Sequence, residues 1–429
     1  MADQFTETLA AAGMKRICGT MARSTYNPSI EDYALIGDCT TAALVSRDGS
    51  IDWLCWPRFD SDTCFAALLG TADNGHWRIA PVDAEVSVNR LYRPGTMIQE
   101  TRFTTAAGSA VLIDFMPMQQ EHSSVVRIVR GESGQLAMRL DLALRFEYGR
   151  IVPWVTRLEH RTLLRAVAGA DAAVLHSEVQ LHGEHFTSVA EFTVAAGESK
   201  AFVLTYAPSY LPSPTVRDAT AALATTERFW TDWTARGSYR GTWQEPVNRS
   251  LLTLKVLTYA PTGGIVAAPT TSLPEQIGGE RNWDYRYCWL RDATFTLLAL
   301  IHAGYRDEAL AFREWLLRAV AGSPGQIQIM YGVAGERRLT ESEVPWLQGF
   351  DGSRPVRIGN AAAGQLQPDV YGELLDATYQ ARRAGLARSR KGWNLSRLLL
   401  LLHLETVWQE PMRGSGRCVA DGGISPSPR

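Results

Sequence analysis

With 429 residues, of which 45% are hydrophobic and 21% charged, the chain is long enough for two domains that each bury a core. Its formal net charge of −2 gives no electrostatic basis for binding nucleic acid or an anionic membrane. No apolar segment reaches the roughly 18 residues of a membrane-spanning helix, so we predict no membrane partner.

The N-terminal segment, residues 1–27, carries no clear apolar period, and we treat it as an extension that starts at either Met1 or Met21. The six cysteines include no CxxC pair, and no histidine lies at a zinc-site spacing from them. Free thiols in a reducing compartment explain this pattern. We therefore predict a cytoplasmic protein without a metal site, and the sequence leaves its oligomeric state open.

Residues 28–214 are predicted to form an antiparallel β-sandwich. In the run Met138–Phe146, apolar side chains alternate with Arg139, Asp141 and Arg145, which is the period of a half-buried strand. Turns that contain glycine separate such runs, and many short strands with such turns favour two packed antiparallel sheets. The predicted turns are Ala106–Gly108, Gly131–Gly134 and Ala195–Gly197. We expect the Asp38, Asp48 and Asp52 cluster to serve in turns and sandwich packing.

A helical period replaces the strand period after the proline-rich stretch 208–214. Residues 215–240 are predicted to form a linker helix, and residues 241–411 a helical domain. Asn248 or Ser250 is the expected cap of its first helix. The predicted helices of this domain are 248–259, 292–303, 307–321, 369–384 and 394–409. The long segment 322–368 between them is predicted to be a functional loop.

The stretch Arg281–Asp292 combines tyrosine and tryptophan rings with arginines and aspartates, immediately before an apolar helix. Aromatic faces and charged hydrogen-bonding groups together suit a sugar, which has an apolar ring face and polar edges. The alternative is a buried Arg–Asp pair that caps the helix beside core aromatics.

Two stretches resemble glycoside hydrolase family 15, the glucoamylase, glucodextranase and trehalase-like enzymes. RNWDYRYCWLRDA, from Arg281, is similar to the substrate-binding motif of that family. The stretch from Ile30 to Gly70, beginning IEDYALIGDCTTAALVSRDGSIDW, is similar to the start of the N-terminal domain of its bacterial members. The resemblance implies a β-sandwich followed by an (α/α)6 barrel. Because we count about five helices where the family has twelve, we expect only the first part of the barrel and an exposed apolar stripe at Leu398–Leu402.

The resemblance also assigns a site for a disaccharide or small oligosaccharide. It implies that Arg291 and Asp292 hydrogen-bond the 4- and 6-hydroxyls of the terminal glucose, that Trp289 lines the same subsite and that Tyr285 lies near the developing oxocarbenium ion. Trp283 belongs to the same motif. Residues of the loop after Gly352 are expected to close on the next sugar, namely Arg357, Asn360, Gln365 and Gln367. The sandwich is expected to contribute the loop Phe146–Arg150 to the mouth of the pocket.

The resemblance implies that the parent reaction is inverting hydrolysis of an α-glucosidic bond, in α,α-trehalose or in malto- or isomalto-oligosaccharides, without a cofactor. It requires one glutamate as general acid and another as general base. In the family, the first belongs to a segment like EGIWEVRG that follows a WQEP helix end. This chain has Trp408–Pro411 and then continues as MRGSGRCVADGGISPSPR.

One set of codons that encodes this tail, when it is translated in a shifted reading frame, gives the peptide EGIWEVRGGRRHFTLSK. We therefore hypothesise that residues 412–429 are an out-of-frame tail after a frameshift. Both catalytic glutamates are then absent and this chain is inactive. Two alternatives remain open: a sugar phosphorylase-like enzyme, for which phosphate dependence would be diagnostic, and a non-catalytic glucan-binding protein, which would bind sugar without turnover.

Overall fold

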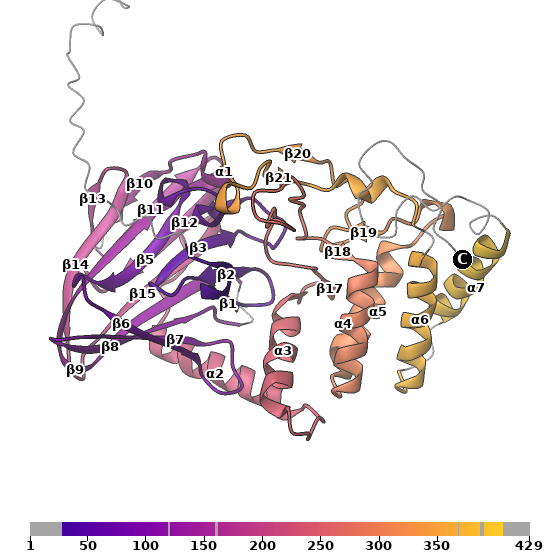
Figure 1. The fold of residues 1–429 in the computed structure, drawn as a ribbon, viewed down its shortest axis with the longest axis horizontal. Helices are drawn as coiled ribbons and strands as arrows, with labels where there is room; N and C mark the ends of the chain where they lie inside the picture. Colours follow the sequence, from indigo (N-terminus) through magenta and orange to yellow (C-terminus); the bar gives the residue numbers. More distant parts are fainter. Residues whose placement is uncertain (1–27, 119–120, 159–161, 368, 387–389, 406–429) are drawn as a thin grey trace, which may run out of the picture.

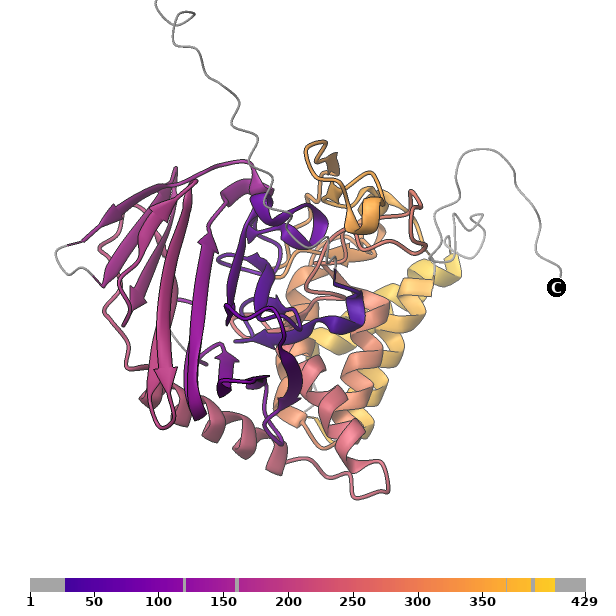
Figure 2. The same cartoon turned by 60° about the vertical axis from the view of Figure 1, so that its left-hand side comes forward.

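The computed structural model describes residues 28–405, except 119–120, 159–161, 368 and 387–389. The predicted extension (1–27) and the predicted out-of-frame tail (412–429) lie outside the described residues. A β-sandwich and a row of helices stand side by side, and α2 runs along one edge of the sandwich before the helices begin (Figures 1 and 2). This order confirms the predicted fold class, an antiparallel sandwich followed by a helical region.

The sandwich consists of two antiparallel sheets. The first sheet contains β1 (Ala34–Gly37), β2 (Ala42–Val45), β3 (Ser50–Cys55), β4 (Thr63–Phe65), β5 (His76–Pro81), β13 (His182–Glu184) and β14 (Thr187–Ala195). The second contains β6 (Ser87–Tyr92), β7 (Gln99–Thr105), β8 (Gly108–Phe115), β10 (Trp154–Arg157), β11 (Leu163–Ala168), β12 (Asp171–Ser177) and β15 (Ser199–Pro208). The long strand β9 (Ser124–Ala143) belongs to both sheets.

The turn predicted at Gly131–Gly134 is wrong, because these residues lie inside β9. The first half of β9 pairs with β15 and the second half with β14. At the crossing, the Gly131 N–H donates to the Glu198 carbonyl over 2.9 Å. A Cβ on Gly131 would lie 2.1 Å from the Ala195 carbonyl oxygen. Glycine is therefore present to allow close backbone approach where the strand passes between sheets, and not to end the strand.

The sandwich core follows the predicted period of two. Met138, Leu140 and Leu142 are all buried between the sheets. The Asp38 carboxylate accepts the backbone N–H groups of Thr40 and Thr41 over 2.8 and 2.9 Å, so the prediction of turn chemistry at this aspartate is confirmed.

Helices α3 to α7 form antiparallel hairpins. The α-helices of the described residues are α1 (Phe146–Gly149), α2 (Ala219–Ala235), α3 (Gln244–Val256), α4 (Leu290–His302), α5 (Arg306–Ala319), α6 (Asp369–Arg383) and α7 (Arg390–Glu405). A short link joins α4 to α5 at one end, whereas the long segments 257–289 and 320–367 lie at the other end, beside the sandwich (Figure 1). These segments contain the two-residue strands β16 (Thr258–Tyr259), β17 (Gly264–Ile265), β18 (Cys288–Trp289), β19 (Met330–Tyr331), β20 (Ser342–Glu343) and β21 (Arg357–Ile358).

Three helix starts differ from the prediction by four residues, and one of them is that of α7, which is helical from Arg390 where we predicted residue 394. α2 begins at Ala219, because the Asp218 carboxylate accepts from the N–H groups of Thr220 and Ala221 and caps the helix there. α3 begins at Gln244, so neither Asn248 nor Ser250 is its cap. Proline is tolerated in a first helical turn, where its missing N–H has no partner to lose, so Pro246 does not delay the start of α3.

The carboxylate of Glu308 on α5 ties α2 and α3 to the hairpins. It accepts from the Trp233 indole N–H over 2.6 Å and from Arg236 over 3.2 Å, and it lies 3.1 Å from Lys255 Nζ. Burial acts to raise the pKa of Glu308, but the Lys255 charge and the Trp233 hydrogen bond outweigh burial and the net pKa lies below its ordinary value. The linker helix is therefore held by an ionised group.

The apolar faces of the helices explain their packing. On α5, Ala309, Phe312 and Leu316 are buried, as their spacing predicts. On α7, Leu398, Leu400 and Leu401 are 49%, 48% and 48% exposed, as expected for an apolar stripe, whereas Leu399 is buried at 1% and departs from that prediction. Among the described residues, no helix combines the length and apolar character needed to cross a bilayer.

Four cysteines fall within the described residues, and all four are buried free thiols: Cys39, Cys55, Cys64 and Cys288. Burial raises the pKa of Cys39 to about 12 and that of Cys55 to about 11.

The sandwich and the helical domain share a core. Trp53 and Leu44 on the sandwich pack in one cluster with Val344, Leu347 and Phe350 from the long segment 320–367. The Trp53 indole N–H also donates to the Pro269 carbonyl over 2.8 Å. The loops that surround the Arg281–Asp292 stretch are therefore built directly on the sandwich.

Candidate functional site

The Arg281–Asp292 stretch is extended up to Trp289 and helical from Leu290, where α4 begins. A bridge from Asp284 to Thr271 and the pairing of β18 with β19 hold the extended part. Because side chains alternate along extended chain, Asn282, Asp284 and Arg286 are buried on one face. Trp283 and Tyr285 point the other way and stay partly exposed.

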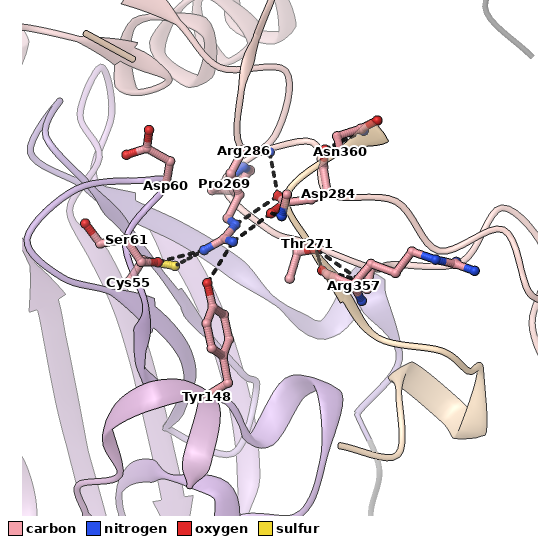
Figure 3. A network of polar contacts seen from close by, with 12 residues as sticks. Cys55, Asp60, Ser61, Tyr148, Pro269, Thr271, Asp284, Arg286, Arg357 and Asn360 are labelled. Atoms are coloured by element: carbon pink, nitrogen blue, oxygen red, sulfur yellow. Dashed lines mark hydrogen bonds and ion pairs between the residues drawn. The ribbon is translucent and has the colours of Figure 1, made fainter. Parts of the chain in front are cut away.

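Asp284 and Arg286 form an ion pair on the buried face of this stretch (Figure 3). Arg286 Nη2 lies 2.7 Å from Asp284 Oδ2, and Arg286 Nε donates to Asp284 Oδ1 over 2.9 Å. The side chains are 1% and 0% exposed, so the two charges depend on each other and not on solvent. The alternative that we weighed, a buried Arg–Asp pair, is therefore present here. It lies away from the start of α4, however, and does not cap that helix.

The aromatic pair of the predicted sugar site is assembled. The rings of Tyr285 and Trp289 lie with centroids 5.9 Å apart at an interplanar angle of 43°. Trp289 is 8% exposed, and its indole N–H is buried without an acceptor among the described residues. A buried donor of this kind calls for a partner, which the described residues do not supply.

The charged pair follows Trp289 directly, in the first turn of α4. Arg291 Nη2 is 3.6 Å from Asp292 Oδ2, and Arg291 Nη1 is 4.0 Å from Asp369 Oδ2 at the start of α6. The Arg291 and Asp292 side chains are 32% and 48% exposed. Partial burial and the charge of Asp369 raise the pKa of Glu373, one turn along α6. The N-terminal ends of α4 and α6 thus place one guanidinium among several carboxyl groups on an accessible surface.

The residues predicted to close on the next sugar lie in two places. The Arg357 guanidinium stacks 4.5 Å above the Trp283 ring and donates to the Glu280 carbonyl over 2.9 Å, so it lies against the motif. Asn360 is buried, and its side-chain amide donates to the Asp284 carbonyl over 3.0 Å.

Gln365 accepts from the Gln367 amide over 3.1 Å, further along the same loop. Through its hydrogen bond to the Asp284 carbonyl, Asn360 supports the backbone of the motif. Sugar binding by these loop residues stays a prediction.

Sequence reasoning considered a buried Arg–Asp pair in this stretch but did not assign it to the two residues that form it. Asp284 and Arg286 lie in the motif, and the alternation of polar and aromatic residues there was the signal that they share a face. Tyr148, in the loop Phe146–Arg150, was expected at the mouth of the pocket. Its hydroxyl instead accepts from Arg286 Nη2 over 2.9 Å behind the motif. No local signal predicts this contact, because 138 positions separate the two residues.

Comparison with known proteins matches both halves of the chain. Residues 21–217 match the trehalase-like N-terminal domain, and residues 241–416 match glycosyl hydrolases family 15. Residues 241–416 are thus a glycosyl hydrolase family 15 domain. The family 15 match includes every residue of the aromatic and charged pairs described above.

Curated relatives match most of this chain. The chain is 35% identical over 381 residues to a trehalase of Mycolicibacterium smegmatis, covering 82% of this chain and 57% of that protein. It is 34% identical over 418 residues to a trehalase of Mycobacterium tuberculosis, covering 90% of this chain and 61% of that protein. The chain thus spans about three fifths of the length of these relatives.

A solved bacterial glucoamylase, in complex with acarbose, has the same fold with a TM-score of 0.62. Its sequence is 12% identical, and the match covers 90% of this chain and 59% of that one. The helical hairpins α3 to α7 are accordingly part of an (α/α)6 barrel.

Proposed function

We propose that the aromatic pair Tyr285–Trp289 and the charged pair Arg291–Asp292 bind the terminal glucosyl unit of an α-glucoside. The observation that carries this proposal is the contact of two aromatic rings, 5.9 Å apart, at the helix end that presents the partly exposed Arg291. A sugar stacks its apolar face on such rings, and a guanidinium and a carboxylate serve adjacent hydroxyl groups. The unpaired Trp289 N–H supplies a further donor.

The glucoside that we propose is α,α-trehalose, with malto- and isomalto-oligosaccharides as the alternatives. Curated relatives that are 35% and 34% identical are trehalases, which favours trehalose. Each of these relatives extends beyond the part matched here, so the support comes from the shared region.

The reaction that we propose for the family 15 domain is hydrolysis with inversion. A carboxylic acid protonates the glycosidic oxygen while a carboxylate on the opposite face activates water, and the two stand about 6.5–9.5 Å apart. The 429 residues contain no segment like EGIWEVRG after Trp408–Pro411. We therefore propose that the residues after Pro411 do not supply the general acid and that these 429 residues bind the sugar without cleaving it, because general acid–base catalysis supplies about 10²–10⁴-fold for one such group.

Titration calorimetry with trehalose, and separately with maltose, tests the binding site. We expect saturable binding by the 429-residue chain, and Arg291→Ala should raise the trehalose Kd by about 10- to 100-fold because hydrogen bonds to charged groups are lost. Arg102→Ala is the matched control, since Arg102 lies in an exposed ion pair on the sandwich. Absence of binding to both sugars, or equal effects of the two substitutions, would refute the proposal.

The reaction needs a second test. The protein encoded by a gene in which the frame after codon 411 is restored should hydrolyse trehalose. Proton NMR at early times should show one α- and one β-glucose per trehalose, as inversion requires. Two α-anomers would contradict inversion. Turnover that depends on phosphate would favour the phosphorylase alternative. Glucose release by the 429-residue chain at enzymatic rates would refute the proposal that this chain is inactive.

A further inference from the structure

The Asp284–Arg286 pair connects the sugar-binding motif to the sandwich. Three of its contacts come from sandwich residues: Arg286 donates to the Tyr148 hydroxyl over 2.9 Å, to the Ser61 carbonyl over 2.7 Å and to Cys55 Sγ over 3.5 Å (Figure 3). With the two bonds to Asp284, every nitrogen of the guanidinium has a partner. Because the guanidinium is planar and rigid, this set of partners defines its orientation.

The same pair holds the backbone around Tyr285. Asp284 Oδ2 accepts from the Gly359 N–H over 3.1 Å, and the Asp284 carbonyl accepts from the Asn360 amide over 3.0 Å. On the other side, the Tyr285 carbonyl accepts from the Ala268 N–H over 2.9 Å. Tyr285 therefore lies between two residues whose side chains are both immobilised, and the direction of its Cα–Cβ bond follows from theirs.

Tyr148 is itself held in an unusual backbone conformation. Its φ is +56°, and Glu147 before it has a φ of +49°, a left-handed region that residues other than glycine rarely occupy. The Trp346 indole N–H donates to the Tyr148 carbonyl over 2.9 Å and thereby ties the loop to the helical domain. Strained residues persist where the surroundings over-determine them, and such residues cluster at functional sites.

A buried ion pair by itself is weak evidence for stability, because desolvation offsets the attraction of the charges. Its value here is geometric. We propose that Tyr148 is a positioning residue: through Arg286 and Asp284, the sandwich sets the orientation of the Tyr285 ring against Trp289. This inference rests on the proposed sugar site, and it makes the N-terminal domain part of that site without direct contact with the sugar.

Tyr148→Phe is the test, because it keeps the ring and removes the hydroxyl that Arg286 reaches. Tyr206→Phe is the matched control: the Tyr206 hydroxyl donates to Asp171 over 2.8 Å within the sandwich, on β15 and β12. Protein labelled with 3-fluorotyrosine gives a ¹⁹F resonance for Tyr285, assigned from its loss in Tyr285→Phe. We expect Tyr148→Phe to shift or broaden this resonance and Tyr206→Phe to leave it unchanged, with no ligand present.

Trehalose titration of the same variants gives the second readout. We expect Tyr148→Phe to raise the Kd by about tenfold, the effect of one lost hydrogen bond, and Tyr206→Phe to leave it unchanged. An unmoved Tyr285 resonance in Tyr148→Phe overturns the inference, even where the sugar binds. A moved resonance in a chain that binds neither trehalose nor maltose refutes the proposed function and leaves the positioning intact.

Discussion

Replacing Asp284 with asparagine should destabilise the segment around α4 by about 3 kcal/mol, because it leaves the buried Arg286 charge unpaired. The carboxylate accepts four N–H groups: those of Arg286 N, Nε and Nη2 and that of Gly359 N. An asparagine keeps one acceptor oxygen and presents an NH₂ group to the other two donors. Arginine does not escape the cost by losing its proton, since its pKa exceeds about 12.

Amide hydrogen exchange measures this loss locally. About 3 kcal/mol corresponds to about 100-fold, at 1.4 kcal/mol per tenfold. Peptides that cover residues 285–302 of Asp284→Asn should therefore exchange about 100-fold faster than those of the wild type wherever exchange requires that segment to open. The measurement suits a protein of two domains, for which a single free energy of unfolding is not defined.

Glu132→Gln is the control, because Arg102 and Glu132 form an ion pair of the same bidentate geometry, with distances of 2.7 and 2.9 Å. The two side chains are 49% and 26% exposed, and a surface pair contributes about 0–1 kcal/mol. Exchange in the β9 peptides of Glu132→Gln should therefore rise by less than about tenfold. Equal effects of Asp284→Asn and Glu132→Gln would show that burial does not determine the free-energy cost of removing the carboxylate from an ion pair.

Three further predictions concern other parts of the chain. The pKa of Glu308 is lowered from its ordinary value of 4.5, so its stabilising effect is present above that pH and is lost as the pH falls through the folded-state pKa; the difference in Tm between wild type and Glu308→Gln should shrink between pH 6 and pH 3.5. Gly49→Ala should lower Tm more than Gly169→Ala: both glycines have positive φ, but a Cβ on Gly49 would lie 2.4 Å from the Ile79 carbonyl oxygen, whereas a Cβ on Gly169 meets nothing within 4 Å. In a chain with Cys18 and Cys418 replaced by serine, a thiol reagent at pH 8 should react only after denaturation, because the pKa of Cys55 is raised to about 11 and its thiolate fraction is on the order of 1 in 1000.

Local periodicity predicted much of the fold. The alternation from Met138 identified the second half of β9, although this strand ends at Ala143 and not at Phe146, and the spacing of Ala309, Phe312 and Leu316 identified the buried face of α5. Both patterns depend only on which side of an element faces the core. The same reasoning failed at Gly131, since a glycine that ends a strand and one that permits a close backbone crossing have the same local sequence.

The aromatic and charged residues of the candidate site were also predictable, because Tyr285, Trp289, Arg291 and Asp292 lie within one short stretch. Their surroundings were not. Sugar binding by Asn360 stays a prediction, and the hydrogen bond from its side-chain amide to the Asp284 carbonyl was not expected. That contact joins residues 76 positions apart, so no pattern in either stretch encodes it.

The sequence by itself determined the identity of the elements and the chemistry of the Arg281–Asp292 stretch, because propensity, period and residue type are local properties. Only the tertiary structure decided which groups hold that stretch in place. Arg286 takes its partners from Cys55, Ser61 and Tyr148, which chain folding brings to one buried point. A charge removed from water requires partners on every side, and those partners exist only after the sandwich and the helices have packed together.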